Sequence, residues 1–306
     1  MNGEGLSDRA KETAGAERDH ADEAYWDASW RRDAPTPVDL DDARLRNHVN
    51  LRLGRLLDHV LAGLPDRRPG WRTFRSQDNG AAAGPKAPPP PGQSQPVVIE
   101  AGCGGSAWLP VFAQRHGCAV IGVDYSARGC ALARATLEQA GAPGRVIQAD
   151  LFDPPAELAG CADVVFSQGL AEHFSPTSAL TARLAWLLKP GGLALTIVPN
   201  MRGLTGLAQR LADRQIFNLH VPLNPMELAR AHAEAGLTPL EHGWLGTLNL
   251  GVVNCSGLPR AVARPLTLTF AGVSMAAWAL ERALRAELPN GLTSPQAYCV
   301  ARKPGA

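Results

Sequence analysis

The sequence predicts an α/β protein built on a doubly wound parallel sheet. Short runs of apolar residues recur from residue 97 onward, and helix-like segments separate them. These runs lack the polar alternation of a half-exposed strand, which indicates strands covered on both faces. The first run also leads into a glycine-rich turn at residues 102–105, and an acidic residue ends the second run.

Composition excludes several classes of function. Lys plus Arg number 30 and Asp plus Glu 29 in 306 residues, so the net charge of +1 gives no general affinity for nucleic acid or anionic lipid. The six cysteines form no CxxC pair and predict neither a zinc site nor a disulfide framework. No apolar run is long enough to span a membrane. We therefore expect a cytoplasmic chain that engages neither nucleic acid nor membrane.

The chain divides into four parts. Residues 1–20 are polar and predict a disordered N-terminus. Residues 21–75 predict a helical lid region, in which apolar residues between Leu40 and Leu61 recur at spacings of three and four. Residues 76–96 are rich in proline and predict a flexible linker or loop. The main domain is expected over residues 97–306.

Within the main domain, apolar runs and helical periodicity predict the elements in order. Strands are expected at 97–99, 119–123, 146–147, 164–166 and 193–198, and helices at 108–116, 127–139, 180–188 and 226–235. A long alternating strand is expected within 237–253 and a final strand at 295–302. A helical insertion at about 258–288 separates these two, and we expect it to cover the carboxyl edge of the sheet, where ligands bind in such folds.

The segment after the first strand carries the chemistry. Glycines at 102, 104 and 105 allow a sharp turn and a close approach of the backbone to a ligand. Asp124 ends the second strand, where a carboxylate is placed to accept both hydroxyls of a ribose. The pattern predicts an adenosine-like ligand, and by itself it also fits a nicotinamide cofactor.

Three observations favour a cationic ligand without phosphates. Glu100 lies at the mouth of the turn, where it would repel a pyrophosphate and attract a sulfonium or an amino group. Ala107 is one position out of register for the third small residue of a dinucleotide motif. Asp150 follows the third strand, where it is placed to accept a hydrogen bond from an adenine amino group.

These motifs resemble the class I S-adenosylmethionine-dependent methyltransferases of the small-molecule type, similar to methyltransferase domains 11 and 25. The resemblance covers residues 97–200 and includes the segments at 167–174 and 188–192 in the family's order. It implies a seven-stranded Rossmann-like sheet with an antiparallel last strand, and S-adenosyl-L-methionine as the cofactor. The residues that it implies for cofactor binding are Glu100, Gly102, Gly104, Asp124, Tyr125, Asp150, Leu151, Ser167 and Gln168.

Two tryptophans near the N-terminus extend this resemblance. Residues 25–30 are similar to the segment that closes over the cofactor in thiopurine-methyltransferase-like enzymes. Trp26 and Trp30 are four residues apart and share one face of a helix. They are therefore expected at the cofactor, although two such aromatic rings also serve simply to pin a helix to the core.

Two histidines are candidates for catalysis. His173 follows the fourth strand at the carboxyl edge, and its imidazole suits a general base at neutral pH. His220 lies in a region that contributes substrate contacts in this family. Each also has a structural interpretation, as a loop residue bonded to nearby carbonyls.

Two other residues near these motifs have simpler expected roles. Asn200 is expected to orient an acceptor or to cap a turn. Cys103 is expected to be a small buried residue. We expect no metal ion.

The sequence therefore favours a methyltransferase that acts on a small-molecule acceptor by in-line displacement. An NAD(P)-dependent oxidoreductase on a similar sheet is one alternative. A cofactor-binding regulator without transfer activity is the other.

Overall fold

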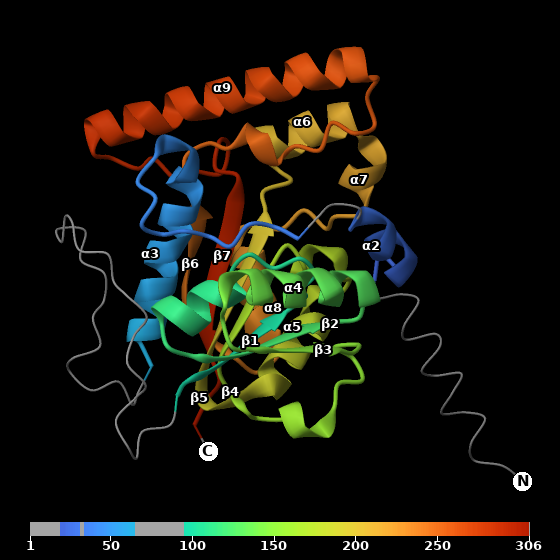
Figure 1. Cartoon of the computed structure of the whole chain (residues 1–306), viewed down its shortest axis with the longest axis vertical. Coiled ribbons are helices and arrows are strands. Elements are labelled where there is room, and N and C mark those ends of the chain that lie inside the picture. The colour runs from blue at the N-terminus through green and yellow to red at the C-terminus, as the bar shows by residue number, and fades with distance from the viewer. Residues whose placement is uncertain (1–18, 31–33, 65–94, 306) are drawn as a thin grey trace, which may run out of the picture.

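A seven-stranded sheet forms the centre of the computed structural model, which describes residues 19–30, 34–64 and 95–305 (Figure 1). The strands lie in the order β3-β2-β1-β4-β5-β7-β6. Strands β1 to β5 pair in parallel, and β7 pairs antiparallel with β5 and β6. The α/β class and the antiparallel last strand are thus confirmed. The strands are β1 Val97–Ala101, β2 Ala119–Asp124, β3 Arg145–Gln148, β4 Ala162–Gln168, β5 Leu188–Pro199, β6 Thr238–Leu245 and β7 Gln296–Arg302.

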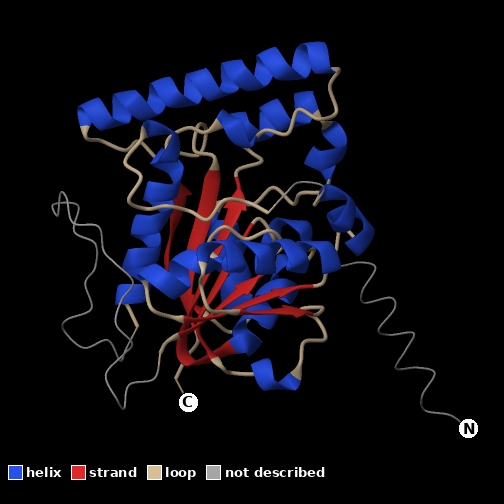
Figure 2. Ribbon diagram, viewed as in Figure 1, coloured by secondary structure: helices blue, strands red, loops and turns tan. Residues whose placement is uncertain are grey.

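Helices cover both faces of this sheet (Figure 2). The α-helices are α2 Glu23–Ser29, α3 His48–Ala62, α4 Ala127–Ala140, α5 Thr177–Leu187, α6 Leu204–Ala212, α7 Arg214–Asn218, α8 Pro225–Glu234 and α9 Arg260–Leu284. Shorter helical turns are η1 Leu45–Asn47, η2 Val111–Arg115, η3 Ala156–Leu158, η4 Ala171–His173 and η5 Leu250–Val252.

Strand β1 shows why the apolar runs lack alternation. Val98 and Ile99 point to opposite faces of the sheet, as successive strand residues must, and both are fully buried. Val98 packs in a core cluster that includes α3 and α4, whereas Ile99 packs in a cluster that includes α5 and α8. Apolar side chains are therefore needed on both faces of the central strands.

The N-terminal helix α3 begins later than the apolar spacing predicts. The spacing starts at Leu40, but α3 starts at His48. Before it, the side chains of Asp39 and Asp42 accept hydrogen bonds from backbone N–H groups two residues further on. Such local turns compete with helix formation. The helix ends at Ala62, and Gly63 follows as its C-cap.

Two other elements are shorter than predicted. The helix expected at 108–116 spans residues 109–115, and its last five residues form the π-helical turn η2. The strand expected within 237–253 ends at Leu245, because Gly246 adopts a φ of 74° that takes the chain out of the sheet.

The segment expected to be disordered, 1–20, and the linker, 76–96, lie outside the described residues except for Asp19, His20 and residues 95–96.

The insertion between β6 and β7 forms the long helix α9, which lies over α6 beyond the carboxyl end of β5 (Figure 1). The indole of Trp278 donates to the Leu248 carbonyl at 2.7 Å. Glu281 pairs with His48 at the start of α3. The insertion thus joins the N-terminal region to the loops after β5 and β6. No helix in the described part of the chain is long and apolar enough to cross a bilayer.

Truncation of the α3 face that meets the sheet should destabilise the protein. Leu57 is 1% exposed, so Leu57→Ala leaves a cavity and should lower the free energy of unfolding by about 2–5 kcal/mol. Leu211→Ala is the matched control, because that side chain is 76% exposed and its truncation should cost less than about 0.5 kcal/mol. Urea unfolding measures both, and equal effects would show that α3 does not pack on the sheet.

Candidate functional site

The glycine-rich turn packs tightly against the end of β2. The N–H of Gly102 donates to the Val123 carbonyl at 2.9 Å, and Gly102 adopts a φ of 73° that suits glycine. A Cβ at Gly104 would lie 2.8 Å from the Trp30 ring and 2.9 Å from Asp124 Oδ2. A larger residue at Gly104 would therefore displace one of these groups.

Two carboxyl groups are buried beside this turn. Asp124 is 7% exposed and accepts hydrogen bonds from the N–H of Gly104 at 2.7 Å and of Ser126 at 2.8 Å. Burial raises its pKa, and these two bonds partly offset the shift. Glu100 is 5% exposed and accepts from the Ser106 hydroxyl at 2.6 Å. Burial raises the pKa of Glu100 to about 8, with a smaller contribution from the charge of Asp124.

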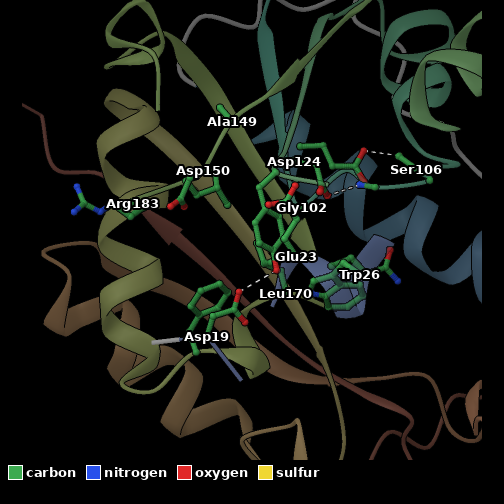
Figure 3. A pocket seen from close by; sticks show the side chains of 18 of the residues that line it. Asp19, Glu23, Trp26, Gly102, Ser106, Asp124, Ala149, Asp150, Leu170 and Arg183 are labelled. Atoms are coloured by element: carbon green, nitrogen blue, oxygen red, sulfur yellow. Dashed lines mark hydrogen bonds between the residues drawn. The ribbon is translucent and has the colours of Figure 1, made fainter. Parts of the chain in front are cut away.

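These carboxyls line a cavity of about 1140 Å³ at the carboxyl ends of the strands, here called the acidic cavity (Figure 3). Asp150, which follows β3, points into the same cavity. Seven of its lining residues are acidic and one, Arg183, is basic. The acidic residues are Asp19, Asp22, Glu23, Glu100, Asp124, Asp150 and Asp153. Acidic residues thus outnumber basic ones around the cavity, which favours a cationic ligand.

Most residues expected at the cofactor line the acidic cavity. They are Trp26, Trp30, Glu100, Gly102, Gly104, Asp124, Tyr125, Asp150, Leu151 and Gln168. The side chain of Ser167 does not line it, contrary to expectation, and is fully buried without a hydrogen-bond partner among the described residues. The reason is strand alternation: Gln168 faces the cavity, so its neighbour in β4 points to the other face.

The described N-terminal segment, residues 19–30, closes one side of the acidic cavity. The Tyr125 hydroxyl donates to the Ala21 carbonyl at 2.7 Å and lies 3.0 Å from Asp19 Oδ2. The N–H of His20 donates to the His173 carbonyl at 2.8 Å. Sequence reasoning missed Asp19, Asp22 and Glu23 as lining residues, because only the folded chain brings this polar segment against the strand ends.

A second cavity, of about 310 Å³, adjoins the first and is here called the histidine cavity. Trp26, Gln168 and Gly169 line both. The other residues lining the histidine cavity are Glu172, His173, Pro199, Met201, Thr205, Gln209, Ile216, His220, Val252, Asn254 and Gln296. Both candidate catalytic histidines are therefore at one site. Thr205, Gln209 and Asn254 carry no motif in the sequence, and sequence reasoning missed them.

The two imidazoles are held in the same tautomer. Nδ1 of His173 lies 3.0 Å from the Leu219 carbonyl, and Nδ1 of His220 lies 2.7 Å from the Ile216 carbonyl. A carbonyl only accepts, so each Nδ1 carries the proton and each Nε2 keeps a free lone pair. Burial lowers the pKa of His173 to about 3 and also lowers the pKa of His220. Both rings are therefore neutral at pH 7, with their centroids 4.7 Å apart.

Glu172 completes this group. Its side chain is buried, and its Oε2 has no hydrogen-bond partner among the described residues. Burial raises its pKa to about 8. One ligand atom from each of Glu172, His173 and His220 lies within 4.8 Å of the others.

Two further candidates have structural roles. The Asn200 amide donates to the carbonyls of Gly291 and Ser294, each at 2.9 Å, and its oxygen accepts from the N–H of Arg202 and Gly203. It therefore caps the turn before α6, which was one of its two expected roles. Cys103 is buried in the glycine turn, and burial raises its pKa well above the ordinary value.

Comparison with known proteins identifies the domain that holds this site. A family model described as a methyltransferase domain matches residues 98–192, which contain the glycine turn, Asp124 and Asp150. Residues 98–192 therefore form a methyltransferase domain. The chain as a whole is similar in fold to a protein from Galdieria sulphuraria assigned as a sarcosine dimethylglycine methyltransferase. The TM-score is 0.53 at 14% identity, over 92% of this chain and 98% of the other.

Curated relatives match this chain over part of their length. A ribosomal RNA small subunit methyltransferase C from Alcanivorax borkumensis is 36% identical over 108 residues, which are 34% of this chain and 32% of the relative. A ubiquinone biosynthesis O-methyltransferase from Chelativorans sp. is 28% identical over 149 residues, 46% of this chain and 58% of the relative. The chain thus spans about a third and somewhat over half of these relatives.

Proposed function

We propose that this protein transfers the methyl group of S-adenosyl-L-methionine to a small-molecule acceptor bound in the histidine cavity. The observation that carries the proposal is the charge of the acidic cavity, where seven acidic side chains and one basic side chain surround the glycine turn. This charge favours a ligand with a sulfonium and an ammonium group, and it disfavours the diphosphate of a nicotinamide cofactor.

The residues of the acidic cavity fit this cofactor. Asp124 already accepts one backbone N–H on each oxygen, and each oxygen keeps a lone pair for a ribose hydroxyl. Asp150 uses Oδ1 to accept from the N–H of Phe152 at 2.8 Å, which leaves Oδ2 for an adenine amino group. Glu100 would hold the cationic methionine part. Tyr125 and Leu151 would flank the adenine, and Gln168 would contact the methionine side.

The methyl group on the sulfonium of the bound cofactor is an electrophile open to in-line attack. The chain has to align an acceptor with it and to exclude water. Residues 19–30 would exclude water. Trp26 in this segment lines both cavities, and its ring meets the His173 ring edge-on at a centroid distance of 5.1 Å. His173 and His220 line the histidine cavity, and their free Nε2 lone pairs would take up the acceptor's proton as methyl transfer makes it strongly acidic.

The size and lining of the histidine cavity support a small, uncharged or weakly polar acceptor. Its volume of about 310 Å³ lies at the lower end of the usual range for small-molecule sites. The described residues that line it include amides, a hydroxyl and apolar side chains, and none is Lys or Arg. A nucleic acid acceptor would call for basic residues around such a cavity.

Removal of the ribose-binding carboxylate tests the cofactor. Asp124→Ala should weaken the binding of S-adenosylhomocysteine by about 1.5–3 kcal/mol, since charge-assisted hydrogen bonds are lost. Isothermal titration measures the change, and Glu157→Ala is the control because Glu157 is exposed and does not line the cavity. Unchanged affinity in Asp124→Ala, or tight binding of NADH to the wild type, would contradict the proposal.

The pH dependence of cofactor binding tests Glu100. The pKa of Glu100 is raised to about 8 in the free protein, and a neighbouring cation would lower it in the complex. The complex then binds fewer protons than the free protein, so the association constant should rise with pH and level off near pH 8. The variant Glu100→Gln should flatten this dependence in titrations between pH 6 and 8.5. A wild-type affinity that falls with rising pH would place the cation elsewhere.

Removal of an imidazole tests the acceptor side. His173→Ala should lower methyl transfer by about 100-fold or more, because the proton acceptor is lost. Affinity for S-adenosylhomocysteine should change little, since His173 does not line the acidic cavity. Release of S-adenosylhomocysteine with a panel of small acceptors gives the rate. Equal losses of rate and of cofactor affinity would indicate a packing role for His173.

A further inference from the structure

We propose that Glu172, His173 and His220 form a site for a divalent transition-metal ion in the wall of the histidine cavity. The three side chains come from η4 and from the segment that follows α7. One ligand atom of each lies within 4.8 Å of the others. This inference rests on the proposed function, because it concerns how the same side chains would act on the acceptor.

The orientation of the imidazoles is the first argument. In both rings the Nδ1–H is bonded to a backbone carbonyl, Leu219 for His173 and Ile216 for His220. Histidines that ligate metals characteristically donate their other N–H in this way, which fixes the ring and the tautomer. Each ring therefore presents an Nε2 lone pair without a change of tautomer.

The second argument is the state of Glu172. Its side chain is 1% exposed, and its Oε2 lacks a hydrogen-bond partner among the described residues. A buried polar atom without a partner costs free energy and calls for an explanation such as an ion. Its other oxygen, Oε1, lies 3.8 Å from His173 Nε2, which is too long for a hydrogen bond. The three groups thus surround a gap instead of satisfying one another.

The distances suit a bound ion after a small adjustment. Bonds of about 2.0–2.2 Å from a metal to nitrogen or oxygen place the ligand atoms roughly 3–4 Å apart. The three side chains would need to close by about 1 Å around the ion. His220 follows the short helix α7 and is only partly buried, whereas Glu172 and His173 are buried, so we expect most of this shift at His220.

The donor set indicates which ions fit. Two imidazoles and one carboxylate suit Zn²⁺, Co²⁺ or Fe²⁺, whereas Mg²⁺ and Ca²⁺ prefer oxygen ligands. Three protein ligands leave coordination positions open, and this cavity is the space they would face. An oxygen atom of the acceptor would then bind the ion, and the ion would favour its deprotonated form. With each Nε2 bound to the ion, the imidazoles would no longer take up the acceptor's proton themselves, and they would promote its loss by holding the ion.

Metal binding by the full chain tests the site without any acceptor. The protein is stripped with a chelator and titrated with Zn²⁺ or with Co²⁺, whose visible absorption reports ligation. We expect one ion per chain, with affinity lowered at least 10-fold in Glu172→Gln and in His220→Ala. His242→Ala is the matched control, because His242 is an exposed histidine on β6 and its loss should leave the affinity unchanged.

Binding of S-adenosylhomocysteine to each variant separates the possible failures. Glu172 and His220 do not line the acidic cavity, so a folded variant should bind this ligand as the wild type does. Wild-type affinity for the metal in both variants, or no stoichiometric binding of Zn²⁺ and Co²⁺ by the wild type, would overturn the metal site. Metal binding with the expected loss in the variants, but without any binding of S-adenosylhomocysteine, would support the site and contradict the proposed function.

Discussion

The removal of two carboxyl groups from water is the constraint on which this site depends. Glu100 and Asp124 are almost fully buried at the ends of neighbouring strands, and burial raises the pKa of both. An acid whose pKa is higher in the folded than in the unfolded state reduces stability as pH rises between the two values. For Glu100 that window runs from about 4.5 to about 8. Burial of a carboxyl group that lowers the stability of the folded state in this way is typical of sites that bind an opposite charge.

The surrounding structure keeps these carboxyls in place. Asp124 binds the N–H of Gly104 in the glycine turn and the N–H of Ser126 at the start of α4. The Trp30 ring packs against the same turn, close to where a side chain at Gly104 would lie. A single carboxylate therefore fixes the turn, the strand end and the next helix relative to one another. This explains why position 104 of the turn requires glycine.

The N-terminal segment connects the two halves of the site. Trp26 lines the acidic cavity and the histidine cavity, stacks on Trp30 at 6.0 Å and meets the His173 ring edge-on. Any movement of α2 would therefore change the shape of the acidic cavity and of the histidine cavity at the same time. Under the proposed function, this coupling would keep water from the methyl group while both ligands are present.

Much of the fold could be read from the sequence because its signals are local. Continuous apolar runs gave the strands, and the glycine turn with Asp124 and Asp150 located the cavity within one stretch of chain. One error arose even within this local range. Ser167 was misplaced because strand alternation turns it away from the cavity that Gln168 lines.

Local sequence thus determined the order of strands and helices and the carboxyl groups at the strand tips, since periodicity and backbone preference act over a few residues. Only the tertiary structure decided what meets at those tips. It brought Asp19 to Tyr125 and His220 to His173, pairs far apart along the chain. It also left Oε2 of Glu172 buried without a hydrogen-bond partner among the described residues. Such encounters depend on how loops close over the sheet, and no short segment encodes them.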